Sequence, residues 1–294
     1  MSEALPDKII LGHNAFFGVD HLSAARGAQR AAQFAEAESI LEIIRIARSL
    51  GAGGLMMSTH EKAQPVARLM LQDPGLKEDF RLYPLLPYAQ KYVTRANEVG
   101  MINLVWEALA GSKVGNTLGM VFKGAKGVLA KDINSILGAL IRLELKPFEK
   151  LGLQVVFLHD VFTDLALALE LPDIFHFYLE EIKKVYGCQG GFATKNLPHF
   201  LECFQAWGIK EPVVMTHFNK TGYHMNPSRR ACEEAAAAHP AHILAMGSLA
   251  SGYLAPDEAY EYLGGVPQVE AVVVGISSPE HARESFKAIQ RNLT

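Results

Sequence analysis

The sequence predicts an α/β fold, a closed (β/α)8 barrel in which eight parallel strands alternate with helices. Eight short apolar runs, most of them ending in a polar residue or glycine, recur along the 294 residues. Segments of helical periodicity lie between them. Continuous apolar runs are typical of parallel strands buried on both faces, and strict alternation calls for right-handed crossovers. Eight is the strand number of the closed barrel, and an open doubly wound sheet is the alternative.

Each element can be placed by its apolar pattern and its end signals. The predicted strands are 9–14, 54–60, 82–88, 154–160, 189–194, 212–219, 242–247 and 271–276. Predicted helices include 35–50, 173–186, 197–207, 227–238 and 279–291. Several of these helices end at glycine or proline, as helices commonly do. We expect the whole chain, 1–294, to form a single barrel domain.

One connection, 89–152, is much longer than an ordinary βα unit. It mixes glycine and lysine with apolar residues at helical spacing and predicts a helical insertion between strands three and four. No run reaches the roughly 18 to 20 apolar residues of a transmembrane helix. A lid over the barrel, an interface in a homo-oligomer and a membrane-touching surface remain open, and a lid or interface is favoured.

The charge balance limits the class of partner. The chain has 28 basic and 31 acidic residues and a net charge of −3, so it is not expected to bind nucleic acid. Its first residues contain neither a basic region nor an apolar run typical of a signal peptide, which predicts a cytoplasmic protein. A small-molecule substrate is the expected partner.

Several segments are similar to one known family. GGFATKNLPHFLECFQAWGIKEPVVMTHFN, HILAMGSLASGYL and AVVVGISSPEHARES resemble strands five to eight of aldo-keto reductases with their following loops and helices. LGHNAFFG near the start and FLHD before residue 161 extend the resemblance to most of the chain outside the insertion. The resemblance implies a barrel of the TIM type with an active site at the C-terminal ends of its strands, and NADP as a cofactor.

The catalytic residues of that family are an Asp, a Tyr, a Lys and a His around the substrate carbonyl. In this sequence the aspartate position holds Ser58 and the tyrosine position Ala63, and the third strand has no lysine at its tip, although Lys91 is close. His159 keeps the histidine position. Carbonyl reduction needs a proton donor with a tuned pKa, so the resemblance does not predict an ordinary reductase.

Four histidines, His13, His60, His159 and His217, end predicted strands. Alternate side chains of a strand share a face, so His13 is expected to share the face of residues 9 and 11. If these faces point inward, four imidazoles converge on one end of the barrel. Neutral imidazole is a ligand for divalent transition metals such as Zn, Fe or Mn, and Asp160 could complete or orient the site. The alternative is four separate hydrogen-bonded core histidines.

Other strand ends carry further candidates. Tyr88, Lys195 and Asn219 are candidate catalytic residues beside His159 and Asp160. Lys195 could act as a Schiff-base nucleophile, although an electrostatic role or a solvated loop position is favoured.

A second group of candidates could bind a phosphate. The turn with Ser277 and Ser278, together with Ser248 and Arg283, resembles the family's clamp for the phosphates of a dinucleotide. Ser278 is also well placed as the N-cap of the last helix, with Pro279 at its first position.

Three functions follow from these residues. The first hypothesis is a divalent-metal-dependent barrel enzyme that hydrolyses, eliminates from or isomerises a small polar substrate. The second is an NADP-dependent oxidoreductase of the aldo-keto reductase type with rearranged catalytic residues, for which Tyr88 and His159 are candidates. The third is a non-catalytic binding subunit that uses the insertion as its interface.

Overall fold

The computed structural model describes residues 4–18, 23–87 and 126–293. Its strands form a closed barrel in chain order, every neighbouring pair being parallel, and β1 pairs with β8. This closure confirms the predicted α/β (β/α)8 TIM barrel and excludes the open sheet. The strands are β1 (Ile9–Gly12), β2 (Gly54–Ser58), β3 (Arg81–Leu86), β4 (Val155–Leu158), β5 (Gln189–Ala193), β6 (Val213–His217), β7 (His242–Met246) and β8 (Val269–Gly275).

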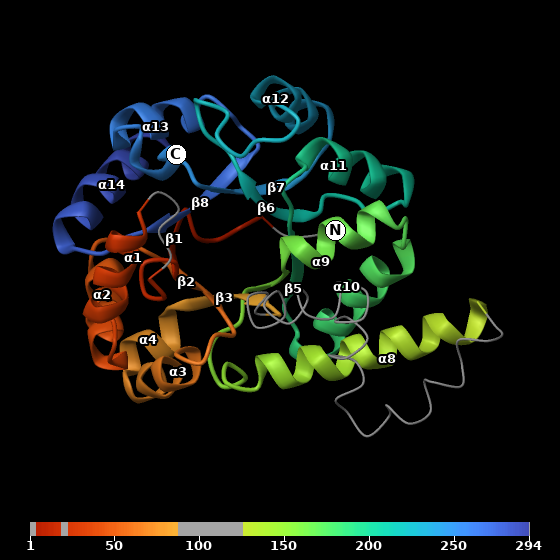
Figure 1. Ribbon diagram of the computed structural model, residues 1–294, viewed down its shortest axis with the longest axis horizontal. Helices are drawn as coiled ribbons and strands as arrows, with labels where there is room; N and C mark the ends of the chain where they lie inside the picture. The colour runs from red at the N-terminus through yellow and green to blue at the C-terminus, as the bar shows by residue number, and fades with distance from the viewer. Residues whose placement is uncertain (1–3, 19–22, 88–125, 294) are drawn as a thin grey trace.

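Helices surround the strands, as Figure 1 shows. They are α1 (Ala24–Gln33), α2 (Ala37–Ser49), α3 (Ala63–Gln72), α4 (Pro74–Asp79), α8 (Lys126–Leu145), α9 (Asp160–Ala168), α10 (Pro172–Tyr186), α11 (Leu197–Ala206), α12 (Arg229–Ala238), α13 (Pro256–Gly264) and α14 (Pro279–Asn292), with a 3-10 turn, η1, at Ala250–Gly252. Local chemistry explains several of their starts. Ser228 and Ser278 accept hydrogen bonds from the backbone N–H groups of Ala231 and His281 and so cap α12 and α14.

The predicted insertion falls largely outside the described residues, and so does Tyr88. Within it, α8 is helical as predicted and lies along α10 before the chain enters β4 (Figure 1). An ion pair between Arg142 of α8 and Glu181 of α10 joins the two helices. None of the helices in the described part of the chain is long and apolar enough to cross a membrane.

Two apolar layers hold the barrel together. One lies between the sheet and its helices and includes Ile9 and Leu11 of β1. The other fills the barrel and includes Ile10, Met56 and Phe157. The expectation that His13 shares an inward face with residues 9 and 11 is therefore wrong, because those two side chains point toward the helices.

The N-terminal end of the barrel, which we call the barrel floor, is closed by residues that precede β1. Leu5 packs within the interior apolar layer, and its backbone N–H donates to Glu270 Oε2 at 3.0 Å. The carboxylate of Asp7 contacts Arg81 Nη1 at 2.7 Å and accepts a hydrogen bond from the Tyr83 hydroxyl at 2.5 Å. The opposite end, where the strands finish at their C-termini, is the barrel mouth.

Substituting Gly191 with alanine should destabilise the protein by about 1 to 3 kcal/mol, the usual cost of overpacking a core. A Cβ atom at this position in β5 would lie 2.7 Å from the Phe157 ring and 2.8 Å from Val155. Chemical denaturation measures the loss of stability. Gly152→Ala is the matched control, since nothing lies within 4 Å of its Cβ position, and equal stability of the two variants would contradict the expectation.

Candidate functional site

The loop after β1 brings His13 into the barrel mouth. β1 ends at Gly12, and the turn that follows places His13 Nδ1 3.2 Å from the carbonyl oxygen of Met56, an interior residue of β2. A carbonyl oxygen only accepts, so Nδ1 carries the hydrogen. His13 is 7% exposed, and burial is the main reason that its pKa is lowered to about 4; the Met56 contact opposes this, and His159 and His60 lower the pKa by smaller amounts. At neutral pH His13 is therefore uncharged.

An aromatic side chain from the same loop covers this part of the mouth. The Phe17 ring stacks on His60 with centroids 4.2 Å apart and lies 4.8 Å from the His13 ring. Lys62 fixes the loop, because its ammonium donates to the carbonyl oxygens of Phe16 at 3.3 Å and Phe34 at 2.8 Å. Burial is also the main reason that the pKa of His60 is lowered. His13 and His60 thus both lie against the Phe17 ring, and these three side chains form one wall of the barrel mouth, which we call the aromatic wall.

A charged cluster follows β4 and β5 on the adjoining part of the mouth. His159 is the N-cap of α9, and its Nδ1 lies 2.5 Å from Asp160 Oδ1. Lys195 Nζ lies 3.2 Å from Asp160 Oδ2. Burial works to raise the pKa of Asp160, but His159 and Lys195 outweigh it and lower the pKa below its usual value. Asp160 is accordingly an anion that links the predicted His159 and Lys195.

A second carboxylate on α9 holds the end of β5. Asp164 accepts hydrogen bonds from the Thr194 hydroxyl at 2.6 Å and the Lys195 backbone N–H at 3.1 Å. Burial raises its pKa, the Asp160 charge adds to this, and the two hydrogen bonds oppose it. Asp164 is not among the residues predicted from the sequence, although its spacing of four residues from Asp160 puts both carboxylates on one face of a helix.

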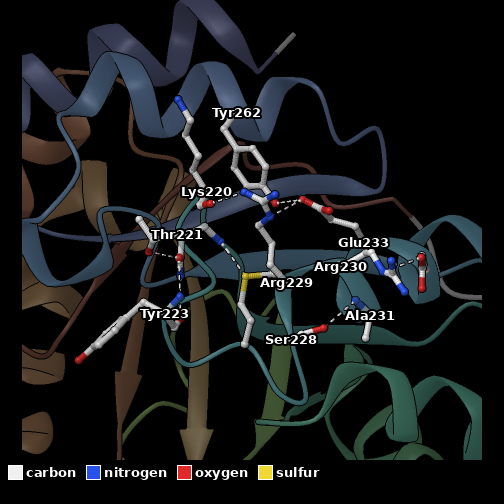
Figure 2. Close-up of polar contacts among 12 residues, drawn as sticks. Lys220, Thr221, Tyr223, Ser228, Arg229, Arg230, Ala231, Glu233 and Tyr262 are labelled. Atoms are coloured by element: carbon white, nitrogen blue, oxygen red, sulfur yellow. Dashed lines mark hydrogen bonds and ion pairs between the residues drawn. The ribbon is translucent and has the colours of Figure 1, made fainter.

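The loop after β6 uses Asn219 internally. The Asn219 side chain is fully buried; its Oδ1 accepts from the Thr221 hydroxyl and the Tyr223 N–H, both at 2.9 Å, and its Nδ2 donates to the Tyr223 carbonyl at 2.8 Å. Figure 2 shows two of these partners, Thr221 and Tyr223, next to each other at the turn of the loop. Within the described part of the chain, the hydrogen bonds of this amide organise the turn, and none joins it to the cluster around Asp160.

The far side of the same loop is tied to α12 and α13. Arg229 donates to the Lys220 carbonyl at 2.6 Å and lies 3.4 Å from Glu233, which accepts from the Tyr262 hydroxyl at 2.5 Å (Figure 2). Lys220 itself pairs with Glu258 of α13 at 2.8 Å. These bonds hold the loop rigidly beside the mouth.

His217, the last residue of β6, packs against neighbouring loops. Its ring centroid is 5.2 Å from that of His224. Gly247 lies so close to it that a Cβ there would be 2.6 Å from His217 Cδ2. Both facts place His217 among the loops after β6 and β7, whereas His13 and His60 belong to the wall beside β1 and β2.

The prediction of a metal centre at His13, His60, His159 and His217 is wrong. Across residues 4–18, 23–87 and 126–293, no three His, Cys, Asp or Glu side chains come together in a way that could hold an ion. His159 turns its Nδ1 toward its own helix, His60 stacks on Phe17, and His217 packs on Gly247. The hypothesis of a divalent-metal-dependent hydrolase, lyase or isomerase loses its basis.

The loop after β7 offers a different kind of site. The Ser248 hydroxyl is buried, and no residue in the described part of the chain hydrogen-bonds to it. Ala250, Ser251 and Gly252 follow with three consecutive positive φ values, 46°, 59° and 89°. The N–H groups of Ala250 and Gly252 already donate to the carbonyl oxygens of Gly247 and Leu249, both at 2.9 Å. The unpartnered Ser248 hydroxyl is therefore the group in this loop that could donate to a phosphate oxygen.

The turn after β8 is less suited to an anion. Ser278 caps α14 as predicted, and the Ser277 carbonyl accepts from Gln33 Nε2 at 3.0 Å. However, the pKa of Glu280 is lowered by its own backbone N–H and by the Ser278 hydroxyl. Arg283 lies 3.9 Å from the same carboxylate. Glu280 therefore already uses the anion-binding groups of this helix start.

The fold of this chain is similar to that of several solved structures. No family model and no curated protein matches the sequence. Among solved structures, the chain is similar to a candidate aldo-keto reductase from Pseudomonas aeruginosa, with 18% identity, a TM-score of 0.62, and coverage of 98% of this chain and 91% of that one. An aldo-keto reductase from Bacillus halodurans in its holo form gives 11% identity and a TM-score of 0.59 over 96% of this chain and 86% of that one.

A third structure contains the cofactor. It is an aldo-keto reductase from Klebsiella pneumoniae in complex with NADPH, with 12% identity and a TM-score of 0.50 over 96% of this chain and 85% of that one. The fold is thus that of an aldo-keto reductase-like TIM barrel. Because these neighbours are reductases and the described residues contain no group of three possible metal ligands, the main hypothesis of a metal-dependent hydrolase, lyase or isomerase is contradicted.

Proposed function

We propose that this chain is an NADP-dependent oxidoreductase of small carbonyl compounds or alcohols that works with rearranged catalytic residues. The observation that carries the proposal is the buried, unpartnered Ser248 hydroxyl in the loop after β7. This hydroxyl would donate to a phosphate of the dinucleotide. NADPH, when bound, supplies the hydride. Because Glu280 already uses the start of α14, Ser248 contributes more than Ser277, Ser278 and Arg283.

His159 is the proposed proton-transfer residue. It lies at the mouth end of β4, its side chain is 21% exposed, and its Nδ1 is backed by the Asp160 carboxylate at 2.5 Å. An imidazole next to an anion can carry the proton that a reduced carbonyl oxygen needs. Neutral His13 and the Phe17 ring line the adjoining wall without adding charge. We infer a small, uncharged substrate for this wall.

Cofactor binding tests the proposal directly. Titration with NADPH, followed by the fluorescence of its nicotinamide, should give a dissociation constant in the micromolar range. Ser248→Ala should weaken binding up to about tenfold, the equivalent of one net hydrogen bond. Ser285→Ala is the matched control, since Ser285 is also 4% exposed but lies on α14.

Two outcomes would count against the proposal. Absence of any NADPH response up to millimolar concentration would dismiss it. NADPH binding without reduction of aldehyde probes such as 4-nitrobenzaldehyde would favour the non-catalytic subunit instead. Single-domain organisation, homo-oligomerisation through 89–152 and a cytoplasmic location stay predictions.

A further inference from the structure

Two neighbours of His159 Nδ1 require opposite protonation states of this nitrogen. The backbone N–H of Val161 lies 3.3 Å away and, as the cap of α9, calls for a lone pair on Nδ1. Asp160 Oδ1 lies only 2.5 Å away and calls for a hydrogen on Nδ1. A nitrogen and a carboxylate oxygen this close would repel each other without a proton between them. The shorter contact, with a charged partner, decides the tautomer.

The surroundings hold Asp160 in the state that this requires. Lys195 Nζ contacts its other oxygen at 3.2 Å, and Asp164 fixes the Lys195 backbone at 3.1 Å. The imidazole of His13, which is buried and uncharged at neutral pH, also interacts with His159. His159 and the Lys195 ammonium thus both favour the ionised form of the Asp160 carboxylate.

We propose that Asp160 is a positioning residue, anchored by Lys195, that fixes neutral His159 as the Nδ1–H tautomer and leaves Nε2 as its proton-accepting atom. The catalytic consequence rests on the proposed function. When a carbonyl is reduced, its oxygen would take the proton of Nε2, and a bound nicotinamide would supply the hydride to its carbon. The C=O π bond would break, C–H and O–H bonds would form, and the imidazolium would become the neutral Nδ1–H imidazole that Asp160 stabilises.

Histidine-selective ¹⁵N labelling and long-range ¹H–¹⁵N spectra test the tautomer without cofactor or substrate. His159→Gln identifies the signals of His159. In the wild type at alkaline pH, Nδ1 should appear protonated and Nε2 unprotonated. In Asp160→Ala the pattern should reverse, because Nδ1 then accepts from Val161. Thr163→Val, which removes a hydrogen bond from α9 to the Leu158 carbonyl oxygen without touching Asp160 or Lys195, is the matched control and should keep the wild-type pattern.

A wild-type protein in the Nε2–H form, or an unchanged pattern in Asp160→Ala, would overturn the inference. Should Asp160→Ala not fold, Asp160→Asn retains the volume and should still lower the share of the Nδ1–H form. If the tautomer reverses as expected while NADPH does not bind, the inference about His159 stands and the proposed function fails.

Kinetics add a second readout once turnover of an aldehyde probe is measured. Asp160→Ala should lower kcat by about 100-fold or more, within the usual range for general acid–base catalysis, and leave the dissociation constant of NADPH unchanged. Thr163→Val, which weakens the packing of α9 on β4 without touching the cluster, should lower kcat by less than about threefold. Equal losses in both variants would mean that Asp160 only supports α9, and would overturn its assigned role.

Discussion

Replacing Asp7 with alanine is expected to lower the free energy of unfolding by about 1 to 4 kcal/mol. Asp7 is 5% exposed and Tyr83 is fully buried, so the variant leaves the Tyr83 hydroxyl without its acceptor at 2.5 Å. An unsatisfied buried polar group costs about 1 to 3 kcal/mol. Loss of the 2.7 Å ion pair with Arg81 adds less, because that side chain is 43% exposed and can reach water.

Urea unfolding of Asp7→Ala, Tyr83→Phe and the double variant separates these contributions. Tyr83→Phe removes the hydroxyl together with its need for a partner, so it should cost only about 1 kcal/mol. In the Tyr83→Phe background, Asp7→Ala should then cost less than in the wild type. Additive losses would show that the contact between Asp7 and Tyr83 contributes nothing specific to the barrel floor.

Acidification from pH 6.5 to pH 4 is expected to remove about 3 kcal/mol of stability through His13 alone. Its pKa is about 4 in the folded protein and about 6.5 in an unfolded chain. Between these values the unfolded state binds the proton and the folded state does not, so acid favours unfolding. The contribution is fully present above pH 6.5 and is lost as the pH falls toward 4.

The measurement is the free energy of unfolding against pH for the wild type and His13→Asn. Asparagine retains an N–H donor for the Met56 carbonyl but does not titrate, so the difference between the two curves should change by about 3 kcal/mol across this window. Asp160 does not interfere: its pKa is lowered, so its stabilising effect is lost only below about pH 4, where an unfolded aspartate titrates. Parallel curves would show that His13 is accessible to protons in the folded state.

The barrel could be predicted from the sequence because its strands are short, apolar and evenly interspersed with helices. Each observed strand begins within two residues of its predicted start and ends one or two residues before its predicted end. The overshoot has a physical reason. Polar residues at the mouth, such as Asn14 and Asn219, follow the last ladder bond rather than belonging to the strand.

The predicted strand ends that lie too far along the chain also explain why the prediction of a metal centre was wrong. Side chains alternate between two faces only while the backbone stays in the ladder, and His13, His60 and His159 all lie beyond it. Their directions are set by the turn after β1, by Phe17 and by the cap of α9. The proximity of Asp160 and Lys195 could be anticipated from adjacent strand ends. The contacts of Lys62 with two distant carbonyl oxygens leave no pattern in the sequence.

The closed barrel floor has a kinetic consequence. Leu5 and the Asp7–Tyr83 pair block passage through the interior, so every molecule that reaches the mouth must also depart through it. If NADPH and the substrate of the proposed function bind one above the other in the barrel mouth, the ligand that lies deeper has to bind first and dissociate last. Compulsory-order kinetics, with inhibition patterns that reveal which ligand is the outer one, would be the signature of this architecture.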